Sequence, residues 1–403
     1  MRWQLPAYSP VGLRALALAS VRTLSGAEQT HASLSEYLRA RYRAEAVVLT
    51  GSGTQALQLA LTISKARFGH ASPVSLPAYS CYDLVSASVG AGVPMSFYDV
   101  DPLTLSFDEV SLRAVAGRRP GAIVAANLFS YPLDWTALRR MAEQEDLFLI
   151  EDASQGLGGS WDGTPTGALG DVTVLSFGRG KGWTGGAGGA LLVRDERALG
   201  ELDRMLASPE ALLPSAFGRG GRAFVVLLAL WALGRPRMYW IPVSVPGLGL
   251  GETVYKDPAP ITEIPAFSAA CALTAAEASH RGVGDRRGAA GRWSDLLDHR
   301  GGEAWSACEP LQGGTSGFLR FAALAPNAPE RNAFAEEGGR FGVWGGYPEL
   351  LPDLPAVRDL SEPSVGLRGA ARLKETLVTL PTHEKVSAAD VRGVAEVLGI
   401  GQN

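Results

Sequence analysis

The chain has 403 residues, of which 46% are hydrophobic and 19% charged, and its formal net charge is −4. This composition is typical of a well-packed globular protein and excludes a disordered chain. The charge balance gives no sign of nucleic-acid binding. The three cysteines are widely spaced and form no CxxC pair, which argues against a disulfide scaffold and favours a reducing, cytoplasmic compartment. The five histidines are scattered, so we expect no metal site.

Short apolar runs alternate with helical patterns between residues 46 and 194. The runs that we expect to form strands lie at 46–50, 73–78, 94–100, 121–128, 147–153, 171–177 and 189–194. Such alternation with short turns predicts an α/β protein with a mainly parallel sheet covered by helices on both faces. Ligands of these sheets bind at the carboxyl ends of the strands.

Residues 195–265 interrupt this pattern with Gly/Pro-rich segments and the apolar run AFVVLLALWALG (223–234), which arginines flank. Eleven apolar residues form a helix of about 16 Å, half the thickness of a bilayer core, so we do not expect the run to span a membrane. Three interpretations remain open for 223–250. The segment is a buried or dimer-interface helix, an element that contacts a lipid surface or an apolar substrate, or loop packing of another kind.

The C-terminal part of the chain predicts a second, smaller α+β domain. Helical patterns cover 266–278 and 286–297, strands are expected around 317–324, and a closing helix is expected over 388–398. We therefore divide the chain into four parts. They are an N-terminal arm (1–33), a large cofactor-binding domain (34–200), an apolar insert (201–265) and a small domain (266–403).

Three segments at the ends of expected strands carry side chains suited to cofactor chemistry. GSGTQAL (51–57) joins a strand to a helix, and its glycines and the helix N-terminus suit an anion, although such turns are often purely structural. Asp152 ends the strand LFLIEDA, where a carboxylate either holds a cationic ring nitrogen or serves as a cap or ion-pair partner. Lys181 follows Ser176 by five residues and stands among glycines, where desolvation would favour its reactive neutral amine. A plain surface-loop lysine is the alternative.

The order of these segments resembles the DegT/DnrJ/StrS family of pyridoxal-phosphate-dependent sugar aminotransferases. Four blocks carry the resemblance: SGTQALQLAL (52–61), LPAYSCYDL with the following GAGVPMSFYDVDPLTLSFD, EDASQGLGGSWDGTPTGALGDVTVLSFGRGK (151–181) and VTLPTHEKVSAADV (378–391). The resemblance implies the fold type I architecture, with a mainly parallel, seven-stranded type of sheet and a smaller C-terminal α+β domain.

The same resemblance implies roles for individual residues. Lys181 would hold pyridoxal 5'-phosphate as a Schiff base and would move the proton during catalysis. Asp152 would pair with the pyridine nitrogen, and Gln155 would face the ring or its phenolic oxygen. The phosphate would be bound by Gly53, Thr54, Gln55 and Ser176. The family often stacks an aromatic ring on the cofactor at the position of Cys81, so either Tyr82 would take its place or the stacking would be weak.

The implied function is transamination from a donor such as glutamate to a keto or aldehyde acceptor. The leading acceptor is a keto-sugar nucleotide of nucleotide-sugar or polysaccharide biosynthesis, and a homodimer would complete the site. Arg320 is a candidate contact for a substrate carboxylate, with a strand-edge salt bridge as the alternative. The family segment that reaches into the partner's site is not recognisable here. The apolar insert stands in its place and suggests a lipid-linked or acyl substrate. Condensation or decarboxylation by the same residues is a further alternative, and a non-catalytic scaffold is the least favoured.

Overall fold

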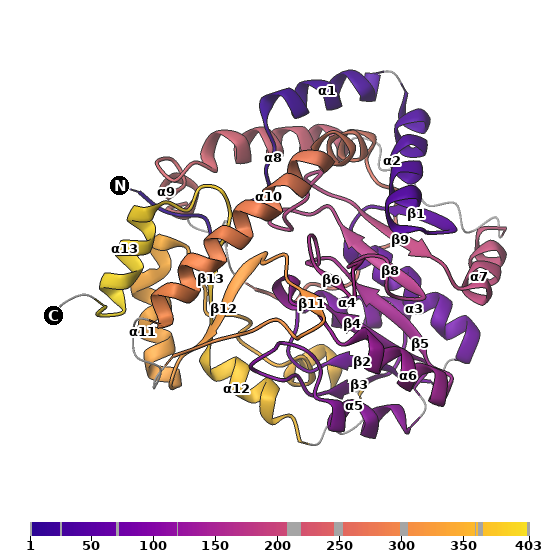
Figure 1. Cartoon of the computed structure of the whole chain (residues 1–403). Coiled ribbons are helices and arrows are strands. Elements are labelled where there is room, and N and C mark those ends of the chain that lie inside the picture. Colours follow the sequence, from indigo (N-terminus) through magenta and orange to yellow (C-terminus); the bar gives the residue numbers. More distant parts are fainter. Residues whose placement is uncertain are drawn as a thin grey trace.

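The computed structural model describes residues 2–400 except 25, 70–71, 119, 208–218, 246–252, 299–304, 359 and 362–365. A seven-stranded sheet forms the centre of the larger part of the molecule, with strand order β1-β9-β8-β5-β4-β2-β3 (Figure 1). Its strands are β1 (Ala46–Thr50), β2 (Val74–Pro77), β3 (Met95–Tyr98), β4 (Ala122–Ala126), β5 (Phe148–Asp152), β8 (Val172–Ser176) and β9 (Gly189–Val193). All adjacent pairs from β8 to β3 are parallel, and β9 runs antiparallel to both of its neighbours. The expectation of a mainly parallel seven-stranded sheet is therefore confirmed.

The strands of this sheet are apolar on both faces because helices cover both faces. In β4, Ala122 and Val124 belong to one core cluster, whereas Ile123 and Ala125 belong to another. This alternation follows from the two-residue period of a strand, which sends successive side chains to opposite faces. A continuous apolar run in the sequence is the result.

Helix α2 (Ala27–Tyr42) precedes β1, and five further helices follow strands of the sheet. These are α3 (Gly53–Phe68), α4 (Asp83–Ala91), α5 (Glu109–Ala116), α6 (Trp135–Glu145) and α7 (Glu196–Leu206). Ser52, Asp108, Asp134 and Asp195 cap α3, α5, α6 and α7, each accepting a backbone N–H three residues later. These caps fix where each helix begins.

The C-terminal part forms a second, antiparallel sheet of β10 (Ser306–Ala307), β12 (Arg320–Leu324) and β13 (Leu377–Pro381). Around it lie α11 (Ala328–Gly338), α12 (Arg368–Thr376), α13 (Ala388–Val397) and the 3-10 turns η3 (Gly339–Phe341), η4 (Leu351–Asp353) and η5 (Pro355–Val357). A third small sheet pairs β11 (Gly314–Thr315) with β6 (Ser160–Trp161), and β6 with β7 (Thr164–Pro165), which connects the two parts. The smaller C-terminal α+β part is confirmed, whereas the domain boundaries at 34, 201 and 266 stay predictions.

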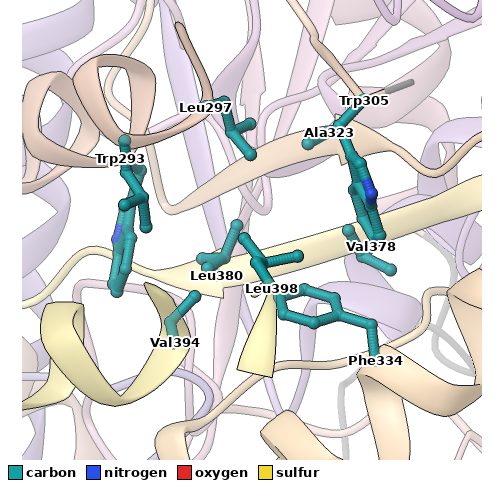
Figure 2. Close-up of a pocket in the computed structure, with 10 residues that line it drawn as sticks. Trp293, Leu297, Trp305, Ala323, Phe334, Val378, Leu380, Val394 and Leu398 are labelled. Atoms are coloured by element: carbon teal, nitrogen blue, oxygen red, sulfur yellow. The ribbon is translucent and has the colours of Figure 1, made fainter. Parts of the chain in front are cut away.

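The core of the C-terminal part contains a small cavity with apolar walls. Trp293, Trp305 and Phe334 form its sides, and Leu380, Val394 and Leu398 complete it (Figure 2). The lining residues belong to one buried cluster that holds α11, α13, β12 and β13 together. We therefore read this cavity as a packing gap of the core and not as a ligand site.

One helix, α10 (Ala266–Asp298), runs the whole way between the two parts (Figure 1). The sequence predicted two shorter helices, because glycines interrupt the pattern. The glycines inside α10, at positions 282, 284, 288 and 291, have open space where a Cβ would lie. Near its start, α10 is tied to the large sheet because Trp183 Nε1 donates to the Ala272 carbonyl. Near its end, Trp293 Nε1 donates to the carbonyl of Pro381 in β13.

The N-terminal helix α1 (Leu13–Leu24) and the helix α8 (Arg219–Leu233) lie at the same end of the molecule, next to the start of α10 (Figure 1). A shared apolar cluster joins the three helices and includes Leu16, Leu227 and Phe267. The short helix α9 (Trp240–Val243) follows α8, and residues 246–250 of the predicted insert lie outside the described residues. In the described part of the chain, every helix is too short or too polar to cross a bilayer.

Candidate active site

The ends of β5 and β8 meet the start of α3 at one edge of the large sheet. Asp152 is the last residue of β5, Ser176 is the last residue of β8, and Gly53 is the first residue of α3. A Cβ on Gly53 would lie only 2.7 Å from the Cβ of Ser176 and 3.2 Å from the Oγ of Ser154. The structure thus brings together segments that the sequence places more than a hundred residues apart, as the parallel topology requires.

The first turn of α3 points its backbone amides toward this edge. Ser52 Oγ accepts the N–H of Gln55, whereas the amides of Gly53 and Thr54 precede the first intrahelical hydrogen bond. Free amides and the helix dipole make such a turn suitable for a phosphate group. Gly53 and Thr54 therefore stand where the sequence predicts phosphate contacts.

The side chain of Gln55 points elsewhere. Its Nε2 donates to the carbonyl of Pro260 at 2.9 Å, and its Oε1 accepts the backbone N–H of Thr262 at 3.1 Å. These bonds anchor the segment before α10 on the start of α3. The phosphate contact expected of Gln55 stays a prediction, and the structure gives this side chain a visible structural role.

Lys181 lies in the loop after β8, beside Ser176. The two residues line one small cavity together with Ser154 and Trp183. The backbone N–H of Gly178 donates to Ser176 Oγ at 3.3 Å, which holds the loop against the end of the strand. The positive charge of Lys181 acts on both Asp152 and Cys81 and lowers the pKa of each. Lys181, Asp152 and Cys81 are therefore neighbours.

Burial raises the pKa of Asp152 above its ordinary value, and this effect outweighs Ser154 and Lys181, which lower it. The backbone N–H of Ser154 donates to Asp152 Oδ1 at 3.0 Å. The adjacent Glu151 is fully buried and satisfied, because it accepts the N–H groups of residues 167, 169 and 170 and the hydroxyl of Thr173. Asp152 has no comparable set of donors in the described structure. Asp152 takes part in none of the salt bridges found among the described residues, and a protonated ring nitrogen would supply such a partner.

Gln155 connects two segments that the sequence analysis did not join. Its Oε1 accepts the backbone N–H of Phe129 at 3.1 Å, and its Nε2 donates to the hydroxyl of Tyr347 at 3.0 Å. The rings of Phe129 and Tyr347 stack with centroids 6.3 Å apart. Burial raises the pKa of Tyr347 well above its ordinary value, so its phenol stays protonated. Gln155 and Tyr347 form one wall of the site.

The 3-10 turn η1 (Leu128–Ser130), which follows β4, carries unusual backbone conformations. Phe129 and Ser130 have φ angles of 51° and 70°, in the left-handed region that non-glycine residues rarely adopt. Each such residue costs about 1–3 kcal/mol and persists only where its surroundings hold it. Here Gln155 holds one side of the turn, and the N–H of Gly317 donates to the Ser130 carbonyl at 3.2 Å on the other. No sequence pattern indicated this turn, since its residues are not glycines.

Cys81 and Tyr82 lie between β2 and α4, as the resemblance requires. Burial raises the pKa of the Cys81 thiol to about 12, so the thiol is neutral. The Tyr82 hydroxyl accepts the backbone N–H of Glu349 at 2.8 Å, and its ring lies 6.2 Å from that of Tyr347. Tyr82 thus belongs to the aromatic wall of the site, and its stacking on a cofactor stays a prediction.

Arg320 is buried at the start of β12. Its guanidinium donates to the hydroxyl of Thr379 at 2.6 Å and to the carbonyl of Gly342 at 3.2 Å, and it lies over the ring of Trp344. Burial lowers its pKa to about 9. These contacts bind β12 to β13 and to the segment before Tyr347. They give Arg320 a structural role, and the predicted contact with a substrate carboxylate has no visible support.

The donor set fits pyridoxal 5'-phosphate. The cofactor has an aldehyde, a basic ring nitrogen and a phosphate, and these match an amine (Lys181), a carboxylate at the end of β5 (Asp152), and a hydroxyl beside a helix N-terminus (Ser176). Ser154, which the sequence analysis missed, donates its backbone N–H to the carboxylate of Asp152 and lies close to Gly53 in the first turn of α3. Its position two residues after Asp152, inside the EDASQ segment, could have indicated this role.

Comparison with known proteins is consistent with this geometry. The model of the DegT/DnrJ/EryC1/StrS aminotransferase family matches residues 17–208. An L-glutamine:2-deoxy-scyllo-inosose aminotransferase of Streptomyces lividus is 34% identical over 173 residues, which cover 43% of this chain and 40% of that relative. The chain thus spans about two fifths of the length of this relative in the match.

Solved structures match nearly the whole chain. A DegT DnrJ EryC1 StrS aminotransferase from Brucella abortus has a TM-score of 0.72 and 22% identity, and the match covers 96% of this chain and 95% of that structure. The PMP form of the sugar aminotransferase Spr1654 from Streptococcus pneumoniae has a TM-score of 0.74 and 18% identity, with 98% of both chains covered. These matches confirm the fold type I architecture. The family model covers Gly53, Asp152, Ser176 and Lys181, so residues 17–208 of this chain resemble the DegT/DnrJ/EryC1/StrS aminotransferase family.

Proposed function

We propose that this protein is a pyridoxal-phosphate-dependent aminotransferase. The observation that carries the proposal is the meeting of Lys181, Asp152 and Ser176 with the first turn of α3 at the carboxyl edge of the sheet. All of these residues lie within the segment that matches the family model. The same segment ends at residue 208, near the start of the insert (201–265), so the proposal for the cofactor is better supported than the proposal for the substrate.

Each side chain has one physical task. When bound, pyridoxal phosphate supplies an electron sink that acidifies the Cα proton of an amino acid. The Lys181 amine accepts and returns that proton, because it stands beside both Asp152 and Ser176. The Asp152 carboxylate keeps a proton on the ring nitrogen by direct ion pairing. Ser176 and the amides of Gly53 and Thr54 bind the phosphate.

We propose glutamate or glutamine as the amino donor and a keto or aldehyde sugar as the acceptor. The relative from Streptomyces lividus is named for L-glutamine and an inosose, which is a cyclic keto polyol. That name supports a polyhydroxylated ketone as the acceptor class. The exposed apolar side chains of α8 and α9 support a second candidate, a lipid-linked ketone. A homodimer, the usual assembly of this fold, stays a prediction.

The test is the absorbance spectrum of the purified protein with added pyridoxal phosphate, before and after glutamate or glutamine. We expect a visible band that the donor removes, and we expect Lys181→Ala to lack the band. Lys65→Ala is the matched control, because Lys65 lies at the far end of α3 and donates to the Ala91 carbonyl. Its spectrum should equal that of the wild type.

Two outcomes would count against the proposal. A bound cofactor that neither donor changes would exclude transamination from these donors and favour condensation or decarboxylation by the same residues. A wild-type protein that shows no cofactor band would refute the cofactor assignment altogether.

A further inference from the structure

Helix α8 is apolar on two opposite sides, yet only one side is covered. Ala223 and Leu227 pack into the cluster shared with α1 and α10. Val225 and Leu228 lie outside that cluster and are 63% and 38% exposed, whereas Phe224, whose ring lies 5.5 Å from that of Phe267 in the cluster, is 36% exposed. A helix that is apolar all round is normally buried. The outer side of α8 therefore exposes apolar side chains to solvent, which is unfavourable unless another apolar surface covers them.

The exposed apolar residues of the molecule gather at this end. Fifteen large apolar side chains are exposed in the described structure, and eleven of them lie in α1 or in residues 224–245. They include Leu18 and Leu24 of α1 and Trp240 of α9. Figure 1 shows α1 and α8 side by side at this end of the molecule. Scattered exposed apolar residues need no explanation, but a concentration of this kind marks an interaction surface. We call it the α1/α8/α9 surface.

The same surface is basic. Residues 1–27 and 211–251 contain seven arginines and no aspartate or glutamate. Six of these arginines are exposed in the described structure: Arg2, Arg14, Arg22, Arg222, Arg235 and Arg237. Arg2 pairs with Asp390 at 2.6 Å, and the other five take part in none of the salt bridges found among the described residues. Glu384 is the acidic neighbour of Arg235, since both act on the hydroxyl of Tyr8.

The positive charge of the α1/α8/α9 surface indicates whether its partner is a second copy of the chain or a lipid surface. A two-fold interface places a surface against itself, so a dimer through the α1/α8/α9 surface would set arginines against arginines. Like charges without carboxylates between them oppose such a contact. An anionic bilayer instead presents both partners that the surface requires, phosphate groups for the arginines and an apolar layer for the side chains between them.

We propose that the α1/α8/α9 surface docks this protein on membranes that contain anionic lipids. The docked protein lies on the bilayer without spanning it, with the outer side of α8 at the boundary of the headgroups. Arginine side chains extend toward the phosphates while their aliphatic stems cover apolar surface. Docking is independent of the cofactor and of the proposed reaction.

The experiment is co-sedimentation of the full-length protein with phosphatidylcholine vesicles, with and without phosphatidylglycerol. We expect binding to the anionic vesicles that weakens as salt is added, and little binding to phosphatidylcholine alone. Each arginine near an anionic surface contributes about 1 kcal/mol, or about fivefold in partitioning. The double change Arg222→Glu with Arg237→Glu should therefore weaken binding by at least about 25-fold. Val225→Ser with Leu228→Ser should weaken binding to anionic vesicles at high salt as well, because it removes the apolar part.

Matched controls come from the opposite end of the molecule, where α5 and α12 lie (Figure 1). Val110→Ser and Arg368→Glu change an exposed valine and an exposed arginine there and should leave vesicle binding unchanged. Equal binding of the wild type to both kinds of vesicle, or no binding to either, would overturn the proposal. So would a change of mass from dimer to monomer in the Val225→Ser, Leu228→Ser variant, measured by light scattering, because it would assign the surface to a second copy.

Discussion

A methyl group added at Gly53 tests how the site is assembled. The Cβ of alanine at this position would lie 2.7 Å from the Cβ of Ser176 and 3.0 Å from its Oγ. The Cβ of Ser176 is fixed by the backbone of β8, so a rotamer change cannot relieve the clash. The start of α3 must instead move away from the end of the strand. We expect Gly53→Ala to separate the first turn of α3, the proposed phosphate-binding turn, from Ser176.

The size of the effect follows from two opposing contributions. Overpacking a well-packed position costs about 1–3 kcal/mol. Alanine in place of glycine in a helix gains at most about 1 kcal/mol, and less in the first turn. The net loss is about 1–2 kcal/mol, and if it falls on the phosphate site it weakens cofactor binding about tenfold.

The assay is a titration of the protein with pyridoxal phosphate, followed by the visible absorbance band, together with a thermal melt without cofactor. Gly200→Ala is the control, because Gly200 lies inside α7 with open space at the Cβ position. It should melt at the wild-type temperature or above and bind the cofactor normally. A Gly53→Ala variant with wild-type affinity and wild-type melting temperature would refute the packing that we describe between α3 and β8.

Three further predictions use other parts of the structure. Because burial raises the pKa of Asp152 above 3.8, the native state holds its proton more tightly than the unfolded chain, and stability falls as pH rises through the folded-state pKa. Asp152→Asn should therefore raise the melting temperature of the cofactor-free protein at neutral pH and reduce the fall in melting temperature between acid and neutral pH. It should also weaken cofactor binding. A lower melting temperature at neutral pH would contradict this reasoning. Gln155→Leu should lower the free energy of unfolding by about 1–3 kcal/mol, because it leaves the buried amide of Phe129 and the buried phenol of Tyr347 unpaired. Hydrogen exchange should increase at residues 128–130. Unchanged exchange there would show that other contacts hold the turn. Arg286 is buried with an unpaired Nε, a hydrogen bond from Nη2 to the Leu157 carbonyl at 3.2 Å and a pKa lowered to about 10 by burial. Because the loss of this bond is offset by removal of a buried charge, Arg286→Met should melt no lower than the wild type. Arg194→Met removes donors to several carbonyls and should lose about 1–3 kcal/mol.

The sequence predicted the large sheet and the meeting of the candidate cofactor residues at its edge, because both are encoded locally. Each buried strand is a short apolar run between turn signals, and the candidate residues follow those runs directly. Once the strands are known to be parallel, Asp152, Ser176 and the start of α3 must meet at one edge. The observed strands agree with the predicted runs within two residues at each end.

The remaining features depend on contacts between distant residues. Gln155 bonds to Tyr347, 192 positions later, and no local pattern encodes such a pair. The partners of Arg320 come from β13 and from residues 342–344, which the sequence analysis could not place beside it, and its contact with a substrate carboxylate stays a prediction. The continuity of α10 was missed for a different reason, because tertiary packing on both of its ends outweighs the low helix propensity of its glycines.

Those glycines set the mechanical character of the link between the two sheets. At 1.5 Å per residue, α10 is about 50 Å long, and hydrogen bonds from Trp183 and Trp293 hold its two ends to different sheets. Between these anchors, four glycines without a packing contact occupy residues 282–291. Each makes the helix about 0.5–1 kcal/mol less favourable than alanine would, so this stretch is where the helix bends at the lowest cost. The link between the two sheets is therefore not held by its ends alone, because Arg286 and Arg287 in this stretch donate to the carbonyls of Leu157 and Gly158 and support the helix where its own backbone is least stiff.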